Sequence, residues 1–166
     1  MLVIAKSFKD LRFGELMQVY EQSNLEAAAE HRNLPAMFAL QLAEQDFRQY
    51  LQEVFFRTPG AFCCIWEKNG RYVSALRLEP YRDGLLLAAL ETVPAFQKRG
   101  YASILIRAVQ QHLAVSGGAK IYSHVNKQNT ASLRTHEKCG FRVISDCAVY
   151  LNGSVDSHCS TFLYDC

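Results

Sequence analysis

Apolar side chains recur with the 3.6-residue period of a helix in several parts of the chain. Residues 13–31 have a helical composition, rich in Glu, Gln, Ala and Leu, and residues 36–55 show the period clearly. The apolar stripe of the second segment consists of Phe38, Leu42, Phe47, Leu51 and Phe55. A third stripe, after a start near Arg99, consists of Ala102, Leu105, Ile106, Val109 and Leu113. A shorter helix is expected over residues 129–138, where Asn129 provides the N-cap.

Elsewhere the pattern changes to that of β-strands. The expected strands cover residues 1–5, 62–66, 71–78, 85–93, 121–125, 141–151 and 155–164. Asn69-Gly70, Asp83-Gly84 and Asn152-Gly153 separate neighbouring strands, and such pairs favour hairpin turns between antiparallel strands. The connection from residues 85–93 through a helix to residues 121–125 requires a parallel pair. The sequence therefore predicts an α/β domain with a mixed, mostly antiparallel sheet.

The composition fits a single globular domain, because 166 residues leave little room for two independent cores. The formal net charge is only +2, so bulk charge indicates neither a nucleic-acid partner nor a membrane partner. The chain begins with neither a signal peptide nor a membrane-spanning run, so we expect a cytoplasmic protein. Its six cysteines are then expected as free thiols, and because no pair has metal-site spacing, no metal is expected.

The turn after residues 85–93 is a candidate phosphate-binding site. The strand ends before Pro94, and a helix is expected to begin near Arg99, where unpaired backbone N–H groups and the helix dipole attract anions. Gly100 and Ala102 allow a bulky pyrophosphate close to the backbone, and Lys98 and Arg99 add positive charge. An ordinary strand-to-helix turn shows the same features. The Rossmann and P-loop glycine patterns are absent, which argues against nucleotide binding of those two kinds.

A second group of polar residues follows farther along the chain. Asn129, Ser132 and His136 share one face of the short helix. On the preceding strand, His124 alternates to one face together with Tyr122. We expect His124 and His136 to face one cleft beside the phosphate turn. A structural role is the alternative for either histidine.

Together these segments resemble the GNAT acetyltransferase superfamily. The central motif of that family reads here as Gln97-Lys98-Arg99-Gly100-Tyr101-Ala102, after an apolar strand that ends at a proline. The next motif reads as Asn129, Ser132, His136 and Gly140-Phe141. The resemblance is strongest over residues 85–141, and the first 60 residues match only in the order of elements. It implies one domain over residues 1–166, with a GNAT-like fold of about four helices and a splayed parallel pair of strands.

The resemblance also implies acetyl-CoA as co-substrate. The backbone of Leu90, Glu91 and Thr92 would hold the pantetheine arm, the N–H groups of residues 98–103 would hold the pyrophosphate, and Asn129 would contact the arm near the thioester. The implied binding set consists of Leu90, Glu91, Thr92, Gln97, Lys98, Arg99, Gly100, Tyr101, Ala102, Ser103, Asn129, Ser132 and His136.

Catalysis would then be direct transfer of the acetyl group to a primary amine. The family's usual tyrosine, which protonates the leaving thiolate, is replaced by His136. An imidazolium with a pKa of about 6.5 can protonate a thiolate whose thiol has a pKa of roughly 8.5. His124 is the first candidate for the base that deprotonates the amine, because a glutamate occupies the matching position in amino-terminal acetyltransferases of the superfamily. Glu91 is the second candidate.

Several alternatives stay open from the sequence. The chain is an acyl-CoA-binding sensor if the replacement by His136 has removed catalysis, and a longer acyl group or a cysteine acyl-enzyme are further enzymatic variants. The acceptor is expected to be a small-molecule or peptide amine. It would be shaped by the first two helices and by a mixed-charge hairpin that contains Arg77, Glu79, Tyr81, Arg82 and Asp83. The sequence leaves the oligomeric state open: many relatives are dimers, and a homodimer would rest on that analogy alone.

Overall fold

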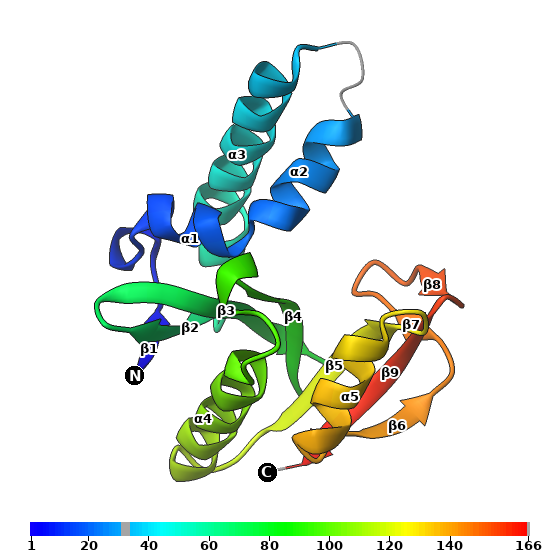
Figure 1. Cartoon of the computed structure of the whole chain (residues 1–166). Coiled ribbons are helices and arrows are strands. Elements are labelled where there is room, and N and C mark those ends of the chain that lie inside the picture. The colour runs from blue at the N-terminus through cyan, green and yellow to red at the C-terminus, as the bar shows by residue number, and fades with distance from the viewer. Residues whose placement is uncertain (31–33, 166) are drawn as a thin grey trace.

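The computed structural model describes residues 1–30 and 34–165, and its centre is a twisted seven-stranded sheet (Figure 1). The strand order is β1-β2-β3-β4-β5-β9-β6. The strands are β1 (Leu2–Ala5), β2 (Phe62–Lys68), β3 (Arg71–Tyr81), β4 (Gly84–Thr92), β5 (Lys120–Asn126), β6 (Arg142–Ser145) and β9 (Cys159–Asp165). Only the pair β4–β5 is parallel among the described strands, so the expected mixed, mostly antiparallel sheet is confirmed.

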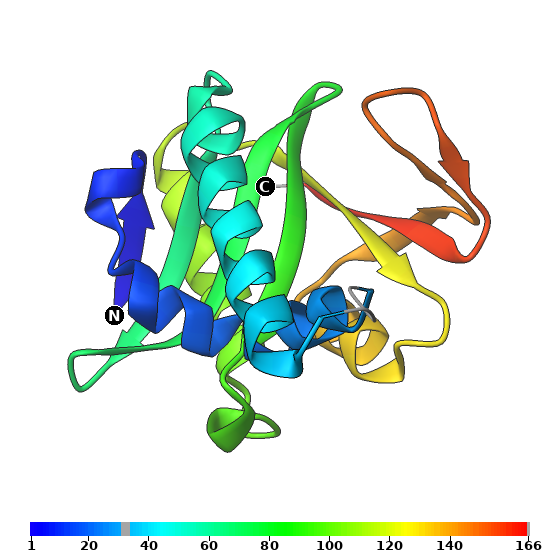
Figure 2. The same ribbon diagram turned by 90° about the horizontal axis from the view of Figure 1, so that it is seen from above.

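Helices cover both faces of this sheet, as Figures 1 and 2 show. The α-helices of the described chain are α1 (Phe13–Val19), α2 (Glu21–Glu30), α3 (Ala36–Glu53), α4 (Tyr101–Val115) and α5 (Thr130–Lys138). One core lies between the sheet and α4, with Leu133 of α5 packed against it. A second core lies on the opposite face, between the sheet and the α1–α3 unit. No helix in the described ranges is long and apolar enough to cross a bilayer.

The first expected helix is divided in two. Residues 13–31 were expected as one helix, but α1 ends at Val19 and α2 begins at Glu21, while His31 lies outside the described residues. Tyr20 between them has φ −92° and ψ 21°, which takes the chain out of the helix. Its ring is buried against Phe47 with centroids 5.4 Å apart. Burial of this large ring therefore overrides the helical propensity of the segment.

The second expected helix differs in its buried face. α3 ends at Glu53, and Phe55 begins a short 3₁₀ turn that follows it. Phe38, which was expected in the apolar stripe, is exposed, whereas the neighbouring Ala39 is buried. Ala39 and Ala43 are the buried small residues of this face, and they let α3 lie close to α2. The spacing of large apolar residues therefore predicted the wrong buried face at the start of α3.

The last two expected strands are also interrupted. Residues 141–151 form β6 and then β7 (Ala148–Val149), and residues 155–164 form β8 (Val155–Asp156) and then β9. β7 and β8 pair only with each other, in a small hairpin beside the main sheet. The breaks let the hairpin leave the plane of the sheet, as Figure 2 shows.

The parallel strands β4 and β5 separate partway along their length. They pair only from Gly84–Lys120 to Leu87–Ser123, and β4 then distorts at Ala89, which has φ +51°. The two strands diverge beyond this point into an open fork (Figure 2). Gly84, which was expected within a turn, is the first residue of β4. A Cβ there would lie 2.3 Å from the backbone oxygen of Lys120, so glycine is required for the close approach of β5.

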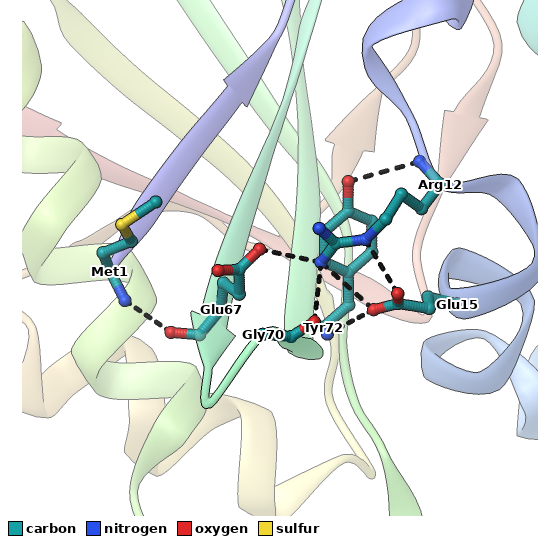
Figure 3. Close-up of polar contacts among 6 residues, drawn as sticks. All are labelled: Met1, Arg12, Glu15, Glu67, Gly70 and Tyr72. Carbon is teal, nitrogen blue, oxygen red and sulfur yellow. Dashed lines mark hydrogen bonds and ion pairs between the residues drawn. The ribbon is translucent and has the colours of Figure 1, made fainter.

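A polar cluster fixes α1 against the hairpin between β2 and β3 (Figure 3). The Arg12 guanidinium donates to Glu67 at 2.7 Å and to the carbonyl of Gly70 at 3.2 Å, and it pairs with Glu15 at 2.7 Å. It also lies 4.3 Å from the ring centre of Tyr72. α2 follows α1 directly along the chain, and the hydroxyl of Ser23 joins it to Glu91 of β4.

Candidate functional site

A cleft of about 610 Å³ lies where the open end of the fork meets the start of α4. α2 forms one wall of this cleft and the first turn of α5 forms another. Its lining consists of Gln22, Ser23, Glu26, Ala89, Leu90, Glu91, Thr92, Phe96, Gln97, Lys98, Gly100, Tyr101, Ala102, Ser103, Asn129, Ala131, Ser132 and Thr135. The first sequence motif, at residues 97–102, and the start of the second, at Asn129 and Ser132, therefore meet in one place.

The N-terminus of α4 presents free backbone donors to the cleft. Gly100 is the N-cap with φ +81° and ψ 6°, and Lys98 also has a positive φ of 59°. The backbone N–H groups of residues 98–103 donate no hydrogen bond within the described part of the chain, and the first helical bond runs from Ile104 to Gly100 at 3.0 Å. A Cβ on Gly100 would meet no protein atom within 4 Å. This turn therefore has both the donors and the space that a pyrophosphate requires.

The side chains around the turn divide into those that face the cleft and those that do not. Gln97 lines it, and its amide donates to the carbonyl of Thr92 at 3.3 Å, which ties the turn to the end of β4. Tyr101 lines it as well, and its hydroxyl accepts a hydrogen bond from Lys68 of β2. Arg99, in contrast to the expectation, lies outside the lining, with its guanidinium 5.5 Å from the ring centre of Phe96.

The opposite wall is the first turn of α5. Asn129 caps this helix, as expected, because its side chain accepts a hydrogen bond from the backbone N–H of Ser132 at 3.0 Å. Asn129 and Ser132 both line the cleft. The exposed polar groups of this turn can therefore contact an extended ligand that lies between β4 and β5.

His136 does not face the cleft. Its side chain is 2% exposed, and its ring packs 5.1 Å from that of Phe141 and 5.8 Å from that of Phe162. Nδ1 lies 2.8 Å from the carbonyl oxygen of Ser132, and the buried Nε2 has no partner among the described residues. Burial lowers the pKa of this imidazole, which disfavours the imidazolium that a proton donor would need.

His124 lies on the other side of the sheet. The centre of its ring lies 5.4 Å from that of Tyr81 and 5.1 Å from that of Tyr150. Both of its ring nitrogens are buried without a hydrogen-bond partner in the described chain. Tyr81, which contacts His124, packs with Leu163 of β9. Phe162, which contacts His136, belongs to the other core, beside α4. Because Phe162 and Leu163 are neighbours on one strand, they face opposite sides of the sheet, and the expectation that His124 and His136 share one cleft is wrong. The alternation on each element was predictable, but the side on which α5 lies was not.

Glu91 is the ionisable group that reaches the cleft from β4. Its carboxylate accepts a hydrogen bond from the hydroxyl of Ser23 on α2. Burial raises the pKa of Glu91, and the bond from Ser23 opposes this shift. Ser23, Gln22 and Glu26 were not predicted, because polar residues on a helix are indistinguishable in sequence from a solvated face.

The two adjacent cysteines, Cys63 and Cys64, do not line the cleft. Cys63 and Cys64 are buried, and burial raises the pKa of the Cys63 thiol to about 12 and that of Cys64 still further. Neither forms the thiolate that a nucleophile requires at neutral pH. Within residues 1–30 and 34–165, no three His, Cys, Asp or Glu side chains are placed to hold a metal ion.

Solved structures with the same fold include several acetyltransferases. PaiA N-acetyltransferase from Thermoplasma acidophilum, in complex with coenzyme A, is 14% identical with a TM-score of 0.68, over 100% of this chain and 99% of that one. The ribosomal-protein-S18-alanine N-acetyltransferase from Escherichia coli is 16% identical with a TM-score of 0.62, over 99% and 94%. An aminoglycoside 6'-acetyltransferase type Ii is 14% identical with a TM-score of 0.61, over 98% and 96%. At these identities the likeness concerns the fold.

No curated protein matches the sequence. The model of the acetyltransferase (GNAT) family matches residues 20–141, a range that includes the fork, the start of α4 and the first turn of α5. The GNAT-like fold implied by the two sequence motifs is therefore confirmed, with α1 and α2 as separate helices where one was expected. Because this match covers well over half of the 166 residues, the chain belongs to the GNAT acetyltransferase family.

Proposed function

We propose that the protein transfers the acetyl group of acetyl-CoA directly to a primary amine. The observation that carries this proposal is the continuity of the fork with the free N–H groups at the start of α4. An acyl-CoA has a peptide-like pantetheine arm that suits an unpaired strand edge, and a pyrophosphate that suits a helix N-terminus. Both requirements are met within one cleft.

The residues that would hold acetyl-CoA follow from this arrangement. The backbone of Leu90, Glu91 and Thr92 lies beyond the last β4–β5 pair and lines the cleft, so its edge is free for the pantetheine arm. The N–H groups of residues 98–103 would bind the pyrophosphate, and Asn129 would contact the arm from α5. Acetyl-CoA supplies the activated thioester.

Glu91 is assigned as the base that removes a proton from the acceptor ammonium. It lines the cleft, and burial raises the pKa of its carboxyl group above the usual value, which strengthens it as a proton acceptor. His124 becomes the second candidate, because both its nitrogens are enclosed and burial lowers its pKa. The neutral amine would then attack the thioester carbonyl, the nitrogen of the adduct would lose its second proton to solvent, and collapse of the adduct would break the carbon–sulfur bond.

The leaving thiolate needs no acid from His136 in this scheme. A thiol with a pKa of roughly 8.5 leaves readily as its anion and takes a proton from water. His136 instead positions the first turn of α5, because its ring is fixed in the core and bonded to the carbonyl of Ser132. Much of the rate enhancement would come from holding amine and thioester together.

The setting that we propose is the cytoplasm. The cysteines of the described chain are free, and two of them are adjacent within the core. Free thiols of this kind are typical of a reducing compartment that also contains acetyl-CoA.

The proposal is tested by following thiol release from acetyl-CoA in the presence of primary amines of graded size and charge. Turnover that requires an amine, and that falls at least about tenfold in Glu91→Gln, is expected. Acetyl-CoA binding without turnover on any amine would support the sensor alternative instead. Faster turnover of a longer acyl-CoA would change the assigned donor but not the site.

A further inference from the structure

Arg77 lies in the middle of β3, beside the point where β4 and β5 separate. It pairs with Ala88 of β4, which is the first residue after the last β4–β5 pair. Its side chain is half-buried on the face that α3 covers. The guanidinium carbon lies 5.5 Å from the ring centre of Phe47, 5.0 Å from Tyr50 and 5.6 Å from Phe55. A cation is therefore held by aromatic rings next to the fork.

Arg77 has no anionic or hydrogen-bonding partner within the described chain. Nε is buried and unpaired, while the two terminal nitrogens are also unpaired but keep contact with solvent. Charged groups in such positions are normally paired, because burying an unpaired donor is costly. The guanidinium is thus partly accessible to solvent and lacks an acceptor among the described residues.

The hydroxyl of Tyr20 is a second unpaired donor in the same place. It is buried and has no partner among the described residues. The Tyr20 ring contacts Phe47 at 5.4 Å between centroids, and the Arg77 guanidinium contacts the same ring. Burial raises the pKa of Tyr20, so the group remains a neutral donor. Two donors without acceptors therefore converge on one side of the fork.

These donors lie near the proposed base, because Arg77 and Glu91 are both electrostatic neighbours of Tyr20. Arg77, Glu79 and Tyr81 alternate to one face of β3, and Tyr81 contacts His124. The electrostatic neighbours of Glu91 include Arg77, yet no ion pair joins the two side chains. A ligand could thus place an ammonium near Glu91 and an anion near Arg77.

We propose that Arg77, together with the hydroxyl of Tyr20, binds a carboxylate of the acceptor, so that the substrates are amines that carry a carboxylate. This inference rests on the proposed acetyl transfer. One guanidinium between apolar rings balances a single negative charge, which favours a carboxylate over a doubly charged phosphate. The planar guanidinium of Arg77 and the single hydroxyl donor of Tyr20 match the two oxygens of a carboxylate.

A purely structural role for Arg77 is the competing explanation. Contact with aromatic rings stabilises a cation, but it leaves the N–H donors without acceptors. Arg48 on α3 offers a matched control, since its guanidinium lies 4.3 Å from the ring centre of Phe13, away from the fork. An internal water between Tyr20 and Arg77 would satisfy their donors without selecting any acceptor.

The first experiment compares ω-amino carboxylic acids of two to six carbons with their carboxamides as acceptors, by thiol release from acetyl-CoA. The wild-type kcat/KM is expected to favour the best carboxylate by about tenfold or more over its carboxamide. Arg77→Gln and Tyr20→Phe should lower kcat/KM for the carboxylate and leave it nearly unchanged for the carboxamide. Arg77→Lys should retain part of the preference, and Arg48→Gln should retain all of it.

The second experiment does not depend on turnover. The CoA-bound protein is titrated with the N-acetyl forms of the same amino acids, and the Nε–H resonance of Arg77 is followed by NMR and assigned by its loss in Arg77→Lys. A saturable shift with the carboxylates and none with the carboxamides is expected. Such a shift without turnover of any amine would refute the proposed acetyl transfer and would still support a carboxylate-binding site at Arg77 and Tyr20.

Two outcomes would overturn the proposal that Arg77 and Tyr20 bind a carboxylate of the acceptor. Turnover without any preference for carboxylates, together with no selective shift of the Arg77 resonance, would refute it. An equal loss for carboxylate and carboxamide in a folded Arg77→Gln protein, checked by its melting temperature, would assign Arg77 to the structure alone.

Discussion

The carboxylate of Glu91 on β4 and the hydroxyl of Ser23 on α2 are joined by a hydrogen bond across the cleft. This contact links the strand that would hold the thioester to a helix of the α1–α3 unit. It also opposes the effect of burial on the ionisation of Glu91. The α1–α3 unit therefore takes part in setting the acid–base properties of the site.

Replacing Ser23 by Ala should move the acid limb of the kcat profile to higher pH. The bond from Ser23 lowers the pKa of Glu91, so its loss lets burial raise that pKa further. A base must be deprotonated to act, and activity is therefore lost at a higher pH in the variant. Ser116→Ala is the control, because that hydroxyl bonds only to the carbonyl of His112 at the end of α4. Coincident profiles for Ser23→Ala and wild type would exclude Glu91 as the titrating group.

Replacing Gly100 by Ala should weaken acetyl-CoA binding at least about tenfold and destabilise the fold by about 1–2 kcal/mol. The fold is destabilised because Gly100 has φ +81°, which strains any residue with a Cβ. Binding is weakened because the added Cβ would occupy the open space at the start of α4 that the pyrophosphate requires. Gly153, in the turn between β7 and β8, has the same φ of +81° with open space around it. Gly153→Ala should therefore show a similar drop in stability by thermal melting and unchanged acetyl-CoA affinity by calorimetry. Equal affinities for both variants would argue against the phosphate turn.

The melting temperature should fall as the pH is lowered below about 6.5, the ordinary histidine pKa. Burial lowers the pKa of both His136 and His124 in the folded protein. The unfolded chain then binds protons that the folded chain does not. The contribution of these histidines to the free energy of unfolding is therefore complete above the unfolded pKa, and it is lost as the pH falls below that value. His136→Phe should flatten this dependence, measured by calorimetric melting between pH 5 and 8 at constant ionic strength. A large loss of kcat in the folded variant would instead restore the leaving-group role of His136.

Incubation with acetyl-CoA alone should leave no acetyl group on Cys63 or Cys64. Burial keeps both thiols protonated, with the pKa of Cys63 raised to about 12. Intact-mass and peptide spectra check this directly, and both cysteines should resist iodoacetamide until the protein is unfolded. An acetylated cysteine that forms and decays at the rate of turnover would replace direct transfer by an acyl-enzyme route.

Much of the cleft could be predicted from the sequence, because its requirements are local. Gly100 allows a left-handed conformation, and Asn129 caps the helix that it begins. A strand that ends at a proline before such a turn points to the same place in the chain. Two local motifs at a suitable separation, together with the family resemblance that they carry, therefore located most of the residues that line the cleft.

The rest depends on packing that no local pattern contains. Ser132 and His136 share a face of α5, yet Ser132 lines the cleft while the His136 ring is enclosed by Phe141 and Phe162. Tyr20 interrupts a segment of helical composition because its ring is buried against Phe47. The contact of Glu91 with Ser23 joins positions 68 residues apart, which only the tertiary fold brings together.

Calorimetric titration of the purified protein with acetyl-CoA, alongside CoA and malonyl-CoA, tests the central claim most directly. One-to-one binding of acetyl-CoA that is weakened in Gly100→Ala and retained in Gly153→Ala is the expected result. The absence of heat with any of the three ligands, from a protein that melts cooperatively, would contradict the assignment of the cleft to acetyl-CoA.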